Sequence, residues 1–167
     1  MKTPPLNLIE LFNSTVAGLY AADKKYLKCY ETIAKTAMSA ELSHTLSPEQ
    51  TNLESHMSKL SLLIDLQGLK TSRITQVLDD QLYTEAMDCC GFAKQKSILK
   101  DIQLLHCAQQ ILQSKIIRLE SLYLTAKELK KEQAVNLIHE IKADHKQTYS
   151  ELLEIAQHKL YPLAHQI

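Results

Sequence analysis

Hydrophobic residues recur every three or four positions along most of the chain, and this spacing predicts helices and no strands. Five helical segments are expected, over residues 6–37, 41–67, 75–90, 96–129 and 131–161. Gly68 and Gly91 follow the second and third segments and are typical of left-handed helix ends. Pro48 predicts either a kink in the second segment or a short separate turn before it.

Asp23 interrupts the hydrophobic stripe of the first segment at a position where a leucine would be expected. A carboxylate in a helical core is costly unless a metal ion, a basic group or a hydrogen-bond network pairs with it. The stripes of later segments also carry polar residues, namely His56, Gln109 and His145, and Asp144 lies beside His145. The stripes therefore indicate a polar site inside the fold.

Counting residues from the turns indicates that these polar groups can meet. Asp23 lies about fifteen residues before the first turn, which places it within one helical turn of His56 on the next segment. Asp144 and His145 lie about fourteen residues after the last turn and would face residues 116–117. The four groups can therefore share one layer.

Two histidines and a carboxylate form a ligand set that suits zinc or ferrous iron. One hypothesis is therefore a single zinc or iron site built from Asp23, His56, Asp144 and His145. The alternatives are a buried hydrogen-bonded network that needs no cofactor, or seam residues that partly reach solvent. The pattern is inferred from helical periodicity and includes no compact metal motif.

The order of the predicted segments favours an all-α fold. The chain has 167 residues, with 3 glycines, 4 prolines and no tryptophan. This length is enough for one domain over residues 1–167, with a core at about residues 6–161. Two pairs of long helices joined by a linker with a shorter helix are typical of a ferritin-like four-helix bundle. The expected architecture is thus two long hairpins with an extra short helix in the crossover.

Charge and cysteine usage narrow the functional classes. Lys+Arg and Asp+Glu both number 19, so no basic surface for nucleic acid is expected. No segment is apolar enough to span a membrane and no secretory signal is seen, so a cytoplasmic protein is expected. The 4 cysteines include no CxxC pair, and Cys29 and Cys107 are expected to be buried as small hydrophobic side chains.

Several segments carry a family resemblance through their order and spacing. They are residues 11–12, 19–25, 40–42, 59–68, 101–109 and 137–153. In these segments the chain resembles the YciF-like family of stress-associated bacterial proteins, a ferritin-like family of unknown function. The resemblance covers about residues 6–160 and supports the bundle fold.

The resemblance also implies which metal ligands have been replaced. The glutamate of the family's first helix falls on Asp23, and the glutamate pair of its second helix falls on Thr51 and Asn52. Two glutamates of its fourth helix fall on Leu112 and Lys115. Two close divalent ions need several carboxylates, and an inward lysine would oppose them. The resemblance therefore implies a bundle that has lost most of a di-iron ligand set.

The expected function is a non-catalytic, stress-associated bundle that forms a homodimer and holds no cofactor. No phosphate loop, nucleophile motif or HExxH motif points to an enzyme. Apolar residues outside the main stripes can form a dimer face or a surface for an unknown protein partner, unless the third segment covers them. They are Leu62, Leu66, Ile111, Ile117 and Leu124.

Overall fold

The structure, a computed structural model, describes residues 5–69, 76–91 and 96–166. These residues form helices, and no strand occurs among them. The elements are α1 (Leu8–Thr36), α2 (Ala40–Thr45), α3 (Pro48–Thr51), α4 (Leu53–Leu66), α5 (Val77–Gly91), α6 (Ile98–Glu128), α7 (Glu132–Ile155), the π-helix η1 (Ala156–Leu160) and α8 (Tyr161–Ala164). None of the described helices is long and apolar enough to cross a membrane.

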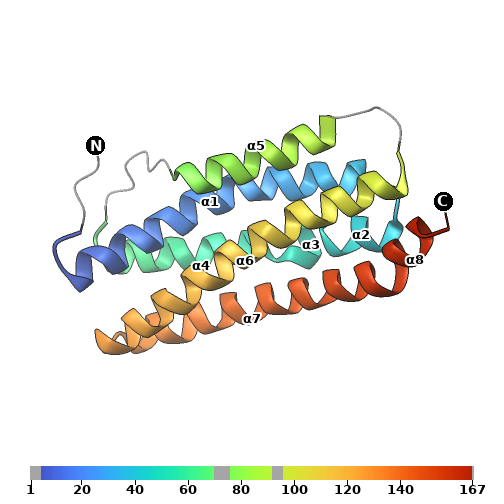
Figure 1. The fold of residues 1–167 in the computed structure, drawn as a ribbon. Coiled ribbons are helices and arrows are strands. Elements are labelled where there is room, and N and C mark those ends of the chain that lie inside the picture. The colour runs from blue at the N-terminus through green and yellow to red at the C-terminus, as the bar shows by residue number, and fades with distance from the viewer. Residues whose placement is uncertain (1–4, 70–75, 92–95, 167) are drawn as a thin grey trace.

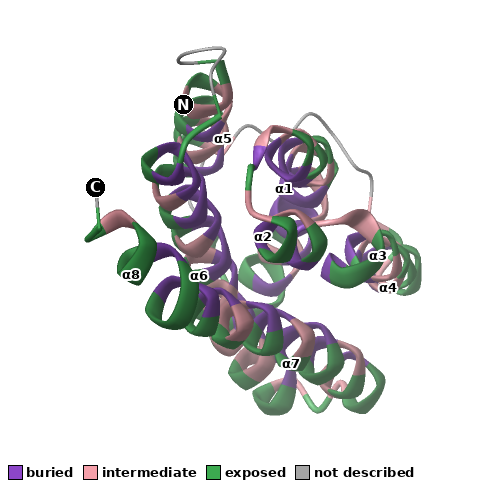
Figure 2. Cartoon of the chain, turned by 90° about the vertical axis from the view of Figure 1, so that its right-hand side faces the viewer, coloured by how far each residue is buried: buried purple, intermediate pink, exposed green. Residues whose placement is uncertain are grey.

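The bundle consists of α1, the α2–α4 stretch, α6 and α7 (Figure 1). The first hairpin packs α1 against α4, the second packs α6 against α7, and the pairs meet through contacts of α1 with α6 and of α4 with α7. Buried residues face the space between these helices (Figure 2). This arrangement confirms the all-α fold of two long hairpins.

The extra helix of the crossover is α5, which lies outside the bundle along α1 and α6 (Figure 1). Its expected first residue, Thr75, lies outside the described residues, and its helical structure continues to Gly91. Only Asp79 and Ala86 of α5 are buried, so its packing face is narrow. Leu82, Tyr83 and Met87 pack against the core while partly exposed, and polar contacts of Asp79 add to this attachment.

Helix ends are set by local chemistry that the sequence shows. Asn7 and Ser97 accept hydrogen bonds from the backbone N–H groups of Glu10 and Lys100, and so cap the starts of α1 and α6. Gly68 has a φ of 61° and ends the first hairpin in the left-handed conformation, as expected. The turn predicted between the last two long helices is also confirmed, at residues 129–131.

The segment predicted as one helix over 41–67 is divided into three. Ser47 and Pro48 begin the single turn α3, so the short separate turn is the alternative that occurs. The chain then passes through Asn52 in a left-handed conformation (φ 55°) before α4 starts. Asparagine tolerates this conformation better than other non-glycine residues, which explains the break.

The hydrophobic core is split into two clusters along the bundle axis. One cluster includes Tyr26, Leu53, Leu112 and Leu152, and the other includes Leu19, Leu60, Leu119 and Ile141. On each of the four long helices the boundary between the clusters falls at a polar residue, and these residues are Asp23, His56, Lys115 and His145. The middle of the bundle is therefore a polar layer between two apolar halves.

Candidate functional site

An ion pair between Lys115 of α6 and Asp23 of α1 lies at the centre of the polar layer. Each side chain is only 1% exposed. Burial lowers the pKa of Lys115, and the adjacent Asp23 opposes this shift in part. The Tyr26 ring lies 6.0 Å from Lys115 Nζ and adds a weak cation–π contact. Asp23 thus has a basic partner inside the core.

His56 of α4 links the layer to the surface of α7. Its Nε2 lies 2.9 Å from Asp144 Oδ2, and the Asn52 side-chain amide donates to the same oxygen at 3.0 Å. Burial lowers the pKa of His56, with the Asp144 hydrogen bond opposing this and Lys115 adding to it. A neutral His56 therefore donates from Nε2 to Asp144.

The Asp144 carboxylate is charged and half-buried. Burial alone would raise the pKa of Asp144, but hydrogen bonds from His56 and Asn52 more than offset it, so the pKa is lowered. A charged acceptor on Nε2 fixes the ring of His56.

His145 of α7 completes the layer. Its ring meets the ring of His56 edge-on, with the centroids 4.6 Å apart. Burial holds the pKa of His145 well below its usual value, and the charge of Lys115 lowers it further. Both histidines are therefore neutral at pH 7, and the positive charge of the layer resides on Lys115.

Several polar atoms of this layer are buried without a hydrogen-bond partner among the described residues. They are Asp23 Oδ2, His56 Nδ1 and His145 Nε2, and the hydroxyl oxygen of Tyr30 in the adjoining apolar cluster is also without a partner. Unpartnered buried polar atoms are uncommon in folded proteins and carry a desolvation cost. The layer therefore lowers the stability of the fold relative to a fully apolar core.

The structure brings together the side chains that the stripes indicated, in three adjoining contacts. Asp144 contacts His56, His56 contacts His145, and Asp23 pairs with Lys115 rather than with either histidine. Gln109, expected at the seam of α6, is only half-buried, and Lys115 is the residue that α6 contributes to the polar layer. In the sequence, Lys115 lies three residues after Leu112 and four before Leu119, so helical spacing puts it on the same face as these two leucines.

The four predicted ligands are not arranged as one metal-binding group in this structure. Among residues 5–69, 76–91 and 96–166, no group of three or more histidine, cysteine, aspartate or glutamate side chains is placed to hold a metal ion. The Lys115 ammonium contacts Asp23, which the family resemblance assigns as a ligand. A divalent ion here would be repelled by this ammonium group.

A second buried charge, Asp79, attaches α5 to the bundle. The Tyr26 hydroxyl donates to Asp79 at 2.7 Å, and Arg118 Nη1 donates to both of its oxygens at 2.8 and 2.9 Å. Lys25 and Asp80 form a more exposed ion pair beside it. The sequence pattern does not indicate this contact, because acidic residues in the first turn of a helix are common on surfaces.

Asp79→Ala is expected to destabilise the protein by about 2 kcal/mol, because it removes charge-assisted hydrogen bonds from Tyr26 and Arg118. Arg118 is 19% exposed and can be hydrated, which limits the loss. Urea unfolding measures the effect. The neighbouring Asp80→Ala is the control and should change the free energy of unfolding by less than about 1 kcal/mol, because its ion pair is exposed.

Most of the apolar side chains considered for an interaction face are exposed, but Ile111 is fully buried, which corrects that expectation for this residue. Leu62 and Leu66 lie on α4, whereas Ile117 and Leu124 lie on α6. These two helices lie on opposite sides of the bundle (Figure 2). The four exposed residues therefore do not form one continuous face.

A family model described as Domain of unknown function (DUF892) matches residues 7–161. The chain belongs to this family. The match spans nearly all of the described bundle, including the polar layer and α5. No protein with a curated description matches the chain.

Solved structures related to the DUF892 chain show the same fold. The Escherichia coli stress protein YciF is similar with a TM-score of 0.84 and 20% sequence identity, over 91% of this chain and 96% of YciF. YcfI from Rhodopseudomonas palustris is similar with a TM-score of 0.82 and 20% identity, over the same shares of the two chains. These likenesses confirm the ferritin-like helical bundle expected from the sequence.

Proposed function

We propose that this DUF892 protein is a non-catalytic ferritin-like bundle in which a lysine–aspartate ion pair stands in place of a metal centre. The observation that supports the proposal is the buried contact of Lys115 with Asp23 in the central layer. Without a metal centre, such a protein would serve as a stable helical scaffold.

The Lys115 ammonium would repel a divalent ion strongly enough to oppose metal binding. At an effective dielectric constant of about 20, a divalent ion about 4 Å from a lysine ammonium is disfavoured by roughly 8 kcal/mol. Binding of structural zinc is worth about 10–16 kcal/mol, so the ammonium would remove half or more of it. The positive charge that a metal ion would bring beside Asp23 is supplied by the chain itself.

A second candidate function is a single zinc or iron site on Asp23, His56, Asp144 and His145. It is favoured by His56 Nδ1 and His145 Nε2, which are buried without a hydrogen-bond partner among the described residues. Asp144 would then accept a hydrogen bond from His56 Nε2 while Nδ1 binds the metal, as a carboxylate often does for a metal-binding histidine. This candidate requires Lys115 to lose its proton or to leave Asp23.

Metal content measured by elemental analysis tests the proposal, with Lys115→Glu as the informative variant. The wild-type chain should hold well under one metal ion, also after incubation with zinc or ferrous iron. Lys115→Glu removes the repelling ammonium and adds a carboxylate beside Asp23, His56 and His145. It should bind close to one zinc per chain, and its melting temperature should rise with zinc.

Lys28→Glu is the matched control, because it makes the same charge change at an exposed position of α1 and should bind no additional zinc. Near-stoichiometric metal in the wild type that is lost in Asp23→Ala would establish the second candidate instead. A Lys115→Glu variant that folds but binds no zinc would contradict the role given to Lys115.

A further inference from the structure

Four thiols gather where α1, α5 and α6 pack together. Cys29 and Cys107 are buried in the larger apolar cluster, and Cys89 and Cys90 at the end of α5 pack against it half-buried. All four are free thiols. This group lies apart from the polar layer, and nothing in the proposed function uses it.

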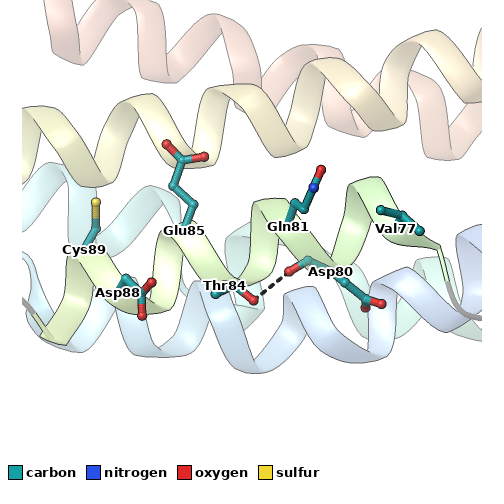
Figure 3. Close-up of a pocket in the computed structure, with 7 residues that line it drawn as sticks. All are labelled: Val77, Asp80, Gln81, Thr84, Glu85, Asp88 and Cys89. Carbon is teal, nitrogen blue, oxygen red and sulfur yellow. Dashed lines mark hydrogen bonds between the residues drawn. The ribbon is translucent and has the colours of Figure 1, made fainter.

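Cys89 and Cys107 are in direct contact. Their sulfur atoms lie 3.7 Å apart, across the interface of α5 with α6. A disulfide needs the sulfurs to approach by about 1.7 Å more. Figure 3 shows the Cys89 side chain pointing from α5 toward the neighbouring α6.

Cys89 is partly exposed and is one of the residues that line an open hollow on the surface of α5 (Figure 3). The hollow is lined by Val77, Asp80, Gln81, Thr84, Glu85, Asp88 and Cys89. The carboxylates of Glu85 and Asp88 disfavour anionic reagents here, so small neutral oxidants are the suitable ones. Cys107 lies behind Cys89, and burial raises its pKa to about 12, which keeps it a thiol until a neighbouring sulfur is activated.

We propose that Cys89 and Cys107 are a redox-active pair that closes to a disulfide between α5 and α6 when a two-electron oxidant such as hydrogen peroxide reaches Cys89. The Cys89 sulfur attacks one peroxide oxygen, the O–O bond breaks, and one water leaves as the sulfenic acid forms. The Cys107 sulfur then attacks the Cys89 sulfur and loses its proton, and the sulfenic oxygen leaves as a second water. The thiols lose two electrons and two protons, and the peroxide is reduced to water.

Cys90 is the competing thiol, because it adjoins Cys89 in the sequence. Its side chain lies beside Thr36 and the charged end of Lys100, on the side of α5 that faces α1 and the start of α6. No sulfur–sulfur contact of Cys90 occurs among the described residues comparable to that of Cys89 with Cys107. The geometry therefore favours Cys107 as the partner of Cys89.

Oxidation of the reduced full-length protein with a small excess of hydrogen peroxide tests this pair. Intact-mass measurement under denaturing, alkylating conditions should show the loss of two hydrogen atoms per chain and two thiols still open to alkylation. Lys94, Lys96 and Lys100 lie between the two cysteines, so trypsin separates them and a disulfide appears as a linked pair of peptides. Fragmentation of that pair identifies the bonded residues.

Three variants make the result decisive. Cys89→Ser and Cys107→Ala should both abolish the linked peptides, and far-ultraviolet circular dichroism checks that each is folded. Cys90→Ser should form the same link as the wild type, because it leaves the contacting pair intact. A link from Cys90 to Cys29, a link between two chains, or no link in folded wild-type protein would each overturn the proposal.

Discussion

Replacing Lys115 by methionine should destabilise the folded protein by about 3–5 kcal/mol, the largest single-residue effect we expect in this chain. The substitution keeps most of the length of the side chain but leaves the buried Asp23 carboxylate without its counter-charge. For a chain of this size each kcal/mol lowers the melting temperature by about 2–4 °C, so a fall of roughly 10 °C is expected. Thermal and urea unfolding measure it.

The double variant Asp23→Leu with Lys115→Met provides the control. Replacing a buried ion pair by apolar residues of similar volume is often neutral or stabilising by about 1–4 kcal/mol. The double variant should therefore be much more stable than Lys115→Met alone. If the losses in unfolding free energy of the two single variants simply add in the double variant, the two side chains do not interact.

Lowering the pH from 7 to 5 should destabilise the protein, with His56 and His145 contributing most in this range. Burial lowers the pKa of both rings in the folded state, whereas the unfolded chain binds protons with a pKa of about 6.5. Below that value the unfolded state takes up protons that the folded state does not. As the pH falls, each histidine can therefore lower the free energy of unfolding by up to about 1.4 kcal/mol per pH unit, until the pH reaches the pKa of that histidine in the folded state.

A comparison of variants isolates this histidine effect. His145→Gln should flatten the dependence of unfolding free energy on pH between 7 and 5, because one of the two titrating rings is gone. His139→Gln, at an exposed position of the same helix, should leave the slope unchanged. Equal slopes in wild type and His145→Gln would contradict a neutral, buried His145.

The fold was largely readable from the sequence, because each long helix repeats its apolar positions and has a cap or a breaker near its ends. Asp23, His56 and His145 were found for the same reason, since each interrupts an apolar stripe. The expectation that they lie close together also holds, because residue counting along a hairpin follows from the constant rise of a helix.

Two features could not be predicted in this way. Lys115 has a long apolar stem, so a lysine beside a stripe is usually assigned to the surface, and only the packing shows that its ammonium points inward. Asp79 is buried only because α5 docks on α1 and α6, and that docking depends on the crossover path rather than on local sequence. Both are tertiary contacts between residues far apart in the chain.

The left-handed conformation of Asn52 limits what a substitution at this position can achieve. The family resemblance assigns a pair of carboxylate ligands to Thr51 and Asn52, but here the helix is interrupted between α3 and α4 at this point. A glutamate at residue 52 would have to adopt a backbone conformation that costs it about 1–2 kcal/mol. It would also lose the amide contact to Asp144. A carboxylate introduced at residue 52 would therefore point as a helical side chain does only if the backbone between α3 and α4 were first rebuilt as a continuous helix.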